Sequence, residues 1–115
     1  MKRSVGLSFL CWFLYLMANA QFRLPAYPDS LFNTYYWQRV THFRTLPRSD
    51  QDILFAGNSI TDGSGWGELF DDPHVKNRGI SGDYSAGVLN RLKDITDGKP
   101  AKIFLLTGVN DVSHD

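Results

Sequence analysis

The sequence predicts an α/β fold built on a parallel sheet. Three short β-rich segments follow one another along the chain, and each runs into a loop that contains glycine. The strongest segment, residues 102–106, does not alternate polar and apolar side chains, which is typical of a strand covered on both faces of its sheet. A stretch with helical spacing separates the last two segments, so strand, helix and strand predict a βαβ unit.

Residues 1–20 are predicted to be a secretory signal peptide and not part of this fold. Lys2 and Arg3 precede an apolar run from 5 to 17, and small residues up to Ala20 supply a cleavage site. The run is shorter than the roughly 20 residues that a membrane-spanning helix needs. Cleavage after Ala20 therefore predicts a secreted or periplasmic chain with no membrane span.

The composition excludes several classes of function. The chain has 43% hydrophobic residues and 12 basic against 12 acidic side chains, and loss of Lys2 and Arg3 lowers its formal charge from 0 to −2, so no basic surface is expected for nucleic acid. Its single cysteine, Cys11, lies within the signal peptide, and the rest needs no disulfide. No metal-binding or nucleotide-binding motif is present, so we expect no cofactor.

Residues 21–48 are interpreted as an N-terminal lead-in and an amphipathic helix. Two prolines make the lead-in extended, Asp29 or Ser30 is expected to cap the helix, and Pro47 ends it. A helix over about 31–46 buries one face, which consists of four residues at spacings of four, four and three: Phe32, Tyr36, Val40 and Phe43.

Three consecutive aromatic residues in this helix, Tyr35, Tyr36 and Trp37, have two interpretations. They resemble a platform on which a sugar stacks, but aromatic residues at helical spacing more often belong to a core. We favour the core.

Residues 49–115 contain the three expected strands, at 53–56, around Val75 and at 102–106. A helix is expected before the last strand, capped by Asp83. Its apolar face repeats every three residues at Ala86, Leu89, Leu92 and Ile95. The sequence ends where another helix and strand are expected to follow. We therefore expect residues 49–115 to be the N-terminal part of a domain that is incomplete at its C-terminus.

The loops after these strands hold the residues that suggest chemistry. Ligands of open parallel sheets bind beyond the carboxyl ends of the strands, so the three loops are expected to share one rim. A hydrolase that forms an acyl-serine needs an exposed hydroxyl and hydrogen-bond donors for an oxyanion. Ser59 can supply the hydroxyl and a backbone N–H, Gly82 a second N–H, and Asn110 a side-chain NH₂.

The loops also have a plain structural interpretation. Asn58 and Ser59 can form an ordinary helix-capping turn, and Gly79 and Gly82 can be turn glycines. Each loop taken alone favours that interpretation, whereas the three together on one rim favour a site.

These three loops together resemble the first three sequence blocks of the SGNH (GDSL-type) hydrolases. The matching segments are GNSITDG at 57–63, NRGISGD at 77–83 and GVND at 108–111. The resemblance covers about residues 50–115 and implies a flavodoxin-like three-layer α/β/α sandwich. It also implies a Ser59 nucleophile and an oxyanion hole formed by Ser59, Gly82 and Asn110.

Within this family, the segments around 75–83 and 101–111 are most similar to secreted bacterial sialate O-acetylesterases and other carbohydrate esterases. The resemblance therefore implies a small-molecule or carbohydrate ester as substrate, with an acetyl group on a sugar preferred. Lysophospholipase-like and platelet-activating-factor acetylhydrolase-like lipid esterases are the neighbouring alternatives.

The chain departs from the family pattern at two places. Asn58 stands where the family commonly has aspartate, and the final Asp-x-x-His block that supplies the general base does not follow. Asp111 to His114 spell such a string, but Asp111 is expected to fix the loop of Asn110, so His114 is not assigned as the base. His42 and His74 are interpreted as ordinary polar residues.

Two further residues lie in the serine loop. Trp66 and Asp62 stand close enough in sequence to border a substrate, but we expect Trp66 to pack and Asp62 to cap the next turn. The second glycine after the serine is Gly63, four positions on, which differs from the G-x-S-x-G elbow of α/β-hydrolases.

The sequence therefore predicts a serine esterase that needs no cofactor. The alternative is a catalytically incompetent remnant or a glycan-binding fragment, because loss of the base from a serine triad costs ~10⁶ in turnover. The oligomeric state stays open.

Overall fold

The computed structural model describes residues 23–113. The predicted signal peptide and His114 lie outside these residues. The elements, in chain order, are η1 (Asp29–Leu31), α2 (Thr34–Thr45), β1 (Ile53–Gly57), α3 (Ser59–Asp62), α4 (Trp66–Phe70), β2 (Val75–Gly79), α5 (Ser85–Asn90), α6 (Leu92–Thr96), β3 (Lys102–Leu106) and η2 (Asp111–Ser113). Across residues 23–113, no helix combines the length and apolar character needed to cross a lipid bilayer.

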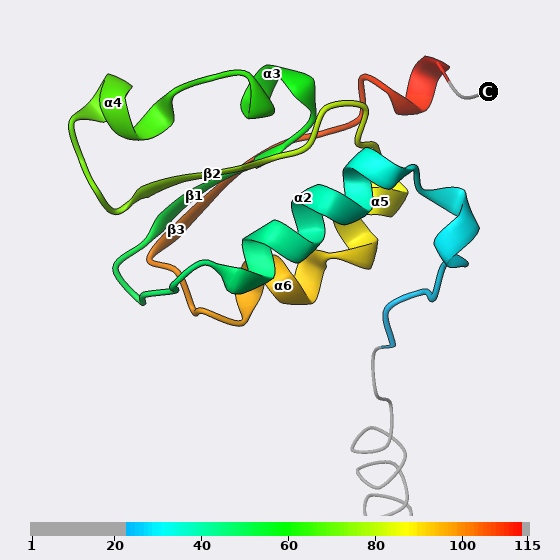
Figure 1. Cartoon of the computed structure of the whole chain (residues 1–115), viewed down its shortest axis with the longest axis horizontal. Helices are drawn as coiled ribbons and strands as arrows, with labels where there is room; N and C mark the ends of the chain where they lie inside the picture. Colours follow the sequence, from blue (N-terminus) through cyan, green and yellow to red (C-terminus); the bar gives the residue numbers. More distant parts are fainter. Residues whose placement is uncertain (1–22, 114–115) are drawn as a thin grey trace, which may run out of the picture.

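The three strands form a parallel sheet in the order β2-β1-β3 (Figure 1). Gly57 at the end of β1 is level with Gly79 at the end of β2 and with Leu106 at the end of β3. The carboxyl ends of all three strands therefore lie at one edge of the sheet. The predicted α/β fold with a parallel sheet is confirmed.

One face of the sheet is covered by α2, α5 and α6 (Figure 1). Leu54 and Ala56 of β1 pack with Val88 of α5 and Ile95 of α6 in a buried cluster. These side chains alternate with Ile53 and Phe55, which belong to the opposite face of the strand.

The expected buried face of the N-terminal helix is confirmed. Phe32 and the α2 residues Tyr36, Val40 and Phe43 form a core with Ile80. The Tyr36 hydroxyl donates to the Gly87 carbonyl over 2.8 Å and joins α2 to α5. Tyr36 is therefore a core residue and Trp37 packs partly buried against it, whereas Tyr35, which was also expected in the core, is exposed.

The start of that helix differs from the prediction. A short 3₁₀ turn at Asp29–Leu31 precedes it, and α2 begins at Thr34. The cap is Asn33 instead of Asp29 or Ser30, because the Asn33 Oδ1 accepts the Tyr36 N–H over 2.9 Å. Leu46, the residue before Pro47, is the C-cap as expected.

The second face of the sheet lies against α3 and α4, which completes the three layers (Figure 1). The Trp66 ring stacks on Phe55 at 4.3 Å, and Phe70 stacks on the same ring at 5.7 Å. Trp66 also donates its indole N–H to the Thr61 carbonyl. Trp66 packs, as the sequence analysis expected.

The helix before β3 is broken into α5 and α6 at Arg91, and its buried face differs from the prediction. Of the four expected residues only Ile95 is buried, whereas Ala86, Leu89 and Leu92 are partly buried. The other buried positions are Gly87, Val88 and Arg91. Asp83 does not cap α5 either, because its carboxylate binds Arg91.

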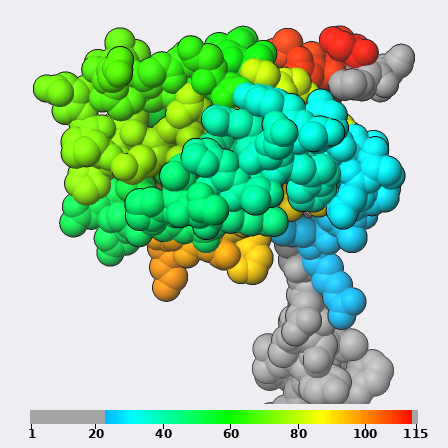
Figure 2. All heavy atoms as spheres, in the orientation of Figure 1, coloured from blue at the N-terminus to red at the C-terminus, as the bar shows by residue number. Residues whose placement is uncertain are grey.

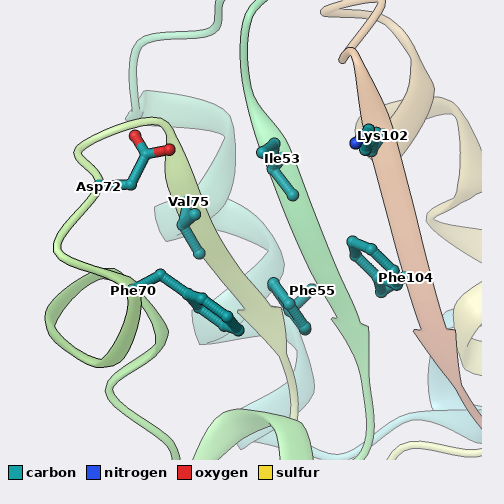
Figure 3. Close-up of a pocket in the computed structure, with 7 residues that line it drawn as sticks. All are labelled: Ile53, Phe55, Phe70, Asp72, Val75, Lys102 and Phe104. Carbon is teal, nitrogen blue, oxygen red and sulfur yellow. The ribbon is translucent and has the colours of Figure 1, made fainter.

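Strand β3 is exposed along its whole length. Phe104 stacks on Phe55 at 4.9 Å but is 52% exposed, and Leu105 on the other face is 54% exposed. Figure 3 shows Phe104, Phe55 and Phe70 beside an open apolar groove of about 290 Å³ on the α4 face. Within residues 23–113, β3 pairs with β1 alone.

Candidate functional site

The loops that follow β1, β2 and β3 meet at one edge of the molecule. Strand register brings the three strand ends level, and the Ile80 N–H donates to the Gly57 carbonyl over 2.9 Å. In Figure 2, α3, the turn after β2 and the segment after β3 lie next to one another along the upper edge. Ser59, Gly82 and Asn110 each belong to one of these loops, which therefore form the rim expected from the sequence.

Ser59 is the first residue of α3 and is exposed. Buried Asn58 caps this short helix, since its Oδ1 accepts the Ile60 N–H over 3.1 Å. The capping interpretation therefore holds for Asn58. The Ser59 N–H meets no acceptor in the described part of the chain, because the first N–H groups of a helix have no intrahelical partner.

Gly82 lies in a tight turn after β2. The turn is closed by the Asp83 N–H, which donates to the Ile80 carbonyl over 3.1 Å. Gly82 has φ +79°, and a positive φ at the third position of a turn favours glycine. The Gly82 N–H donates to no acceptor among residues 23–113, and the residue is exposed.

The side chain of Asn110 reaches back from the β3 loop to the β2 loop. Its Nδ2 donates to the Asp83 carbonyl over 2.7 Å. That bond uses one of the two amide hydrogens and leaves the second available. Asn110 is thereby held beside the residue that follows Gly82.

Asp111 fixes the same loop, as the sequence analysis expected. Both of its carboxylate oxygens accept the Ser85 N–H at 3.1 Å, and Oδ2 also accepts the Ser85 hydroxyl. Asp111 therefore binds the start of α5. Both of its carboxylate oxygens are engaged there.

The described histidines lie away from the rim. His74 immediately precedes β2 and approaches Asp52 to 4.0 Å, at the amino end of the strands. His42 is exposed in the last turn of α2. The part of the chain at 23–113 thus places neither imidazole beside Ser59.

Asp62 is a site-supporting residue whose role the sequence analysis missed. Its carboxylate accepts hydrogen bonds from the Tyr35 hydroxyl at 2.7 Å and from the Ser81 N–H and hydroxyl at 3.0 and 2.8 Å. Arg39 forms an ion pair with it at 3.0 Å. Asp62 therefore ties α3 to α2 and to the turn of Gly82, and it does not cap the next turn.

These contacts determine the protonation of Asp62. Burial favours the neutral acid, but the hydrogen bonds from Tyr35 and Ser81 and the charge of Arg39 outweigh it and hold the pKa of Asp62 below its ordinary value. The same hydrogen bond, with burial, raises the pKa of the Tyr35 hydroxyl.

The Asn77 side chain of β2 forms hydrogen bonds with the backbone of α3 and of the residues after it. Its Nδ2 donates to the carbonyl groups of Thr61, Asp62 and Ser64 at 2.8 to 3.0 Å, and its Oδ1 accepts the Gly79 N–H. A Cβ atom at Gly79 would collide with the backbone of Asp62. The glycine therefore permits the close approach of the helix that begins with Ser59.

The fold of this chain is similar to that of a solved protein structure. No family model and no curated protein matches the chain. A solved structure described as "a putative platelet activating factor from Streptococcus pneumonia" matches 97% of this chain at 25% identity, with a TM-score of 0.60. The chain spans 47% of that structure, about half its length.

No group of three or more His, Cys, Asp or Glu side chains suited to a metal ion occurs in residues 23–113. The three predicted site residues bring to the rim one hydroxyl, two backbone N–H groups and one amide NH₂. Such a set is suited to nucleophilic attack on a carbonyl and to stabilisation of the resulting oxyanion.

Proposed function

We propose that the protein is a serine esterase of the SGNH type that hydrolyses carboxylic esters through an acyl-serine. The observation that carries the proposal is the pair of unengaged backbone N–H groups, of Ser59 and Gly82, on a rim that also holds the exposed Ser59 hydroxyl and the Asn110 amide. The three sequence blocks that resemble the SGNH hydrolases support it. The likeness to the pneumococcal structure supports a hydrolase more generally.

The proposed reaction has two acyl-transfer steps. The Ser59 Oγ attacks the ester carbonyl and gives up its proton to a base, and the carbonyl oxygen becomes an oxyanion that accepts bonds from Ser59, Gly82 and Asn110. Collapse breaks the bond to the alcohol, which leaves with a proton. Water then attacks the acyl-serine, releases the acid and restores Ser59. The base lies outside the residues assigned to the rim.

The proposed substrate is an acetyl ester of a carbohydrate, met outside the cytoplasm after cleavage of the signal peptide. The similarity of the segments around 75–83 and 101–111 to secreted carbohydrate esterases supports this choice. A second candidate is a lipid ester, favoured by the name of the pneumococcal structure, which refers to platelet activating factor.

The test is hydrolysis of p-nitrophenyl acetate by the complete gene product and by its Ser59→Ala variant. Ser64→Ala is the matched control, because it removes a hydroxyl from the same loop that only donates to the Ile60 carbonyl. We expect Ser59→Ala to abolish turnover and Ser64→Ala to retain it. Activity retained in Ser59→Ala would contradict the nucleophile.

An acetylated sugar and a short-chain phospholipid ester, offered to the same enzyme, separate the two substrate classes. A higher kcat/KM for the sugar ester supports the first candidate, and a higher value for the lipid supports the second. Complete absence of ester hydrolysis would favour the alternative of a binding protein without catalysis.

A further inference from the structure

We propose that Arg91, acting through Asp83, is the positioning residue that holds the oxyanion-binding loops in register, an inference that rests on the esterase function proposed above. Arg91 stands at the break between α5 and α6 and is 2% exposed. It is therefore shielded from any substrate. Its guanidinium lies beneath the rim and acts on the site only through its partners.

The guanidinium contacts groups from separate parts of the site. Its Nε donates to the Asp83 Oδ2 over 2.9 Å, and Nη1 donates to the Arg78 carbonyl near the end of β2 over 2.8 Å. Nη2 lies 3.3 Å from the Gly57 carbonyl and 2.9 Å from the same Asp83 oxygen. One buried cation thus joins the ends of two strands to the turn after β2.

Two of these three contacts, those to Gly57 and Asp83, lie within two residues of a proposed oxyanion donor. Gly57 is two positions before Ser59, and Asp83 directly follows Gly82. The Asp83 carbonyl accepts the Asn110 amide over 2.7 Å, so the Arg91 contact extends through Asp83 to the β3 loop. The guanidinium is connected in this way to all three loops.

The free-energy cost of burying the Arg91–Asp83 ion pair indicates that the pair serves to position the loops. The side chains of Arg91 and Asp83 are 2% and 1% exposed, and the desolvation of such a pair commonly offsets its attraction. The buried neighbours Val88 and Ile95 are apolar, so the charged pair is an exception in this layer. A guanidinium supplies several donors in a fixed plane, which a lysine or an apolar side chain does not.

Asp83 itself is fully occupied by these contacts. Its Oδ2 accepts from Arg91, and its Oδ1 accepts the Tyr84 N–H over 3.0 Å. Burial raises the pKa of Asp83, and the Arg91 charge opposes that rise. Because its side chain is 1% exposed and both of its oxygens accept hydrogen bonds, Asp83 serves here to orient the turn.

The experiment compares Arg91→Lys with Ile95→Val in the complete gene product. The lysine keeps the positive charge but loses the planar set of donors. Ile95 is a matched control, since it is 4% exposed and packs in the same layer with Leu54 and Ala56 of β1. In p-nitrophenyl acetate hydrolysis, we expect kcat to fall ~10- to 100-fold in Arg91→Lys with KM nearly unchanged.

The control is expected to keep its kcat within about twofold, because a methylene removed from the core lowers stability without moving the loops. Equal effects on kcat in the two variants, or no effect in Arg91→Lys, overturn the inference. If Arg91→Lys does not fold, Asp83→Asn replaces it and is compared with the same Ile95→Val control. The asparagine keeps an acceptor for the Arg91 guanidinium but weakens their hydrogen bond. Its kcat is expected to fall, and an unchanged kcat overturns the inference.

Amide hydrogen exchange separates this inference from the proposed function. In Arg91→Lys, or in Asp83→Asn if the lysine variant does not fold, we expect faster exchange at Ile80 and Asp83, with the amides of β1 unchanged. If the unmodified protein hydrolyses no ester, the esterase proposal fails, and localised exchange still supports the positioning role. Exchange that is unchanged, or raised uniformly across the sheet, overturns it.

Discussion

At the scale of single residues, Asn110 provides the most direct test of the proposed oxyanion hole. Its amide donates one hydrogen to the Asp83 carbonyl, so the second is available to a substrate oxygen. We expect Asn110→Ala to lower kcat by ~10² to 10³ in p-nitrophenyl acetate hydrolysis. Asn90→Ala is the control, because that amide binds the Tyr36 hydroxyl in the core. A decrease smaller than about threefold would mean that Asn110 only shapes its loop.

Gly82 is expected to show a conformational effect on stability. A Cβ atom added there meets nothing within 4 Å, so the cost of Gly82→Ala comes from its φ of +79° alone. We expect a loss of about 1–2 kcal/mol in the free energy of unfolding, measured by urea denaturation. Gly65→Ala, at a negative φ and with an ordinary contact to the Glu68 Oε2 at 3.7 Å, should cost less. Equal effects at both positions would argue against the strained turn.

The sequence allowed the positions of some of these residues in the fold to be predicted, and not those of others. Ser59, Gly82 and Asn110 follow strands with local signals, because glycine and polar residues interrupt apolar runs. Arg91 gave no such signal, since an arginine in a helix ordinarily faces water. Its acceptors at Gly57 and Arg78 are distant in sequence, so only the folded chain shows that it is buried.

At the scale of elements, Asp62 links α3 to α2 and makes their association sensitive to acid. Its pKa is lowered in the folded protein, so the unfolded chain binds its proton more readily. The stability that Asp62 contributes is therefore present above the unfolded pKa of about 4 and is lost as the pH falls through the lower folded value. Tyr35 and Arg39 lose their ionised partner in that range.

We expect Asp62→Asn to be less stable than the unmodified protein at neutral pH and to show a flatter dependence of stability between about pH 5 and 2. The measurement is urea denaturation at a series of pH values. Asp50→Asn, at an exposed turn position, is the control and should leave the pH profile unchanged. Parallel profiles for Asp62→Asn and the unmodified protein would show that Asp62 contributes nothing specific.

The elements were predictable where the local pattern agreed with the tertiary packing. The four apolar residues around α2 all lie in the core, and the three strands occur where expected. The helix before β3 was predicted as continuous, with a face that repeats every three residues. Ile95 of that face is buried as predicted, but the structure turns Val88 and Arg91 inward in place of the other three residues, because Arg91 binds the strand ends and the helix breaks there.

At the scale of the whole molecule, the parallel sheet was predictable but its coverage was not. A strand of uninterrupted apolar residues predicts helices on both faces, as β1 has. Strand β3 has the same pattern, yet both its faces are exposed within residues 23–113. The apolar pattern predicts that a strand needs cover on both faces, but only the folded arrangement of helices shows whether each face is covered.

The exposed β3 predicts self-association of the 115-residue chain. Ile103, Phe104, Leu105 and Leu106 are 42–54% exposed, and the outer edge of β3 has no partner strand among the described residues. Apolar edges of this kind template pairing with a second chain. In sedimentation over a range of concentrations, we expect association that weakens in Phe104→Lys. Leu69→Lys is the control, since Leu69 is 70% exposed on α4, away from this edge. Monomers at every concentration, or an equal decrease in both variants, would show that β3 is not the associating surface.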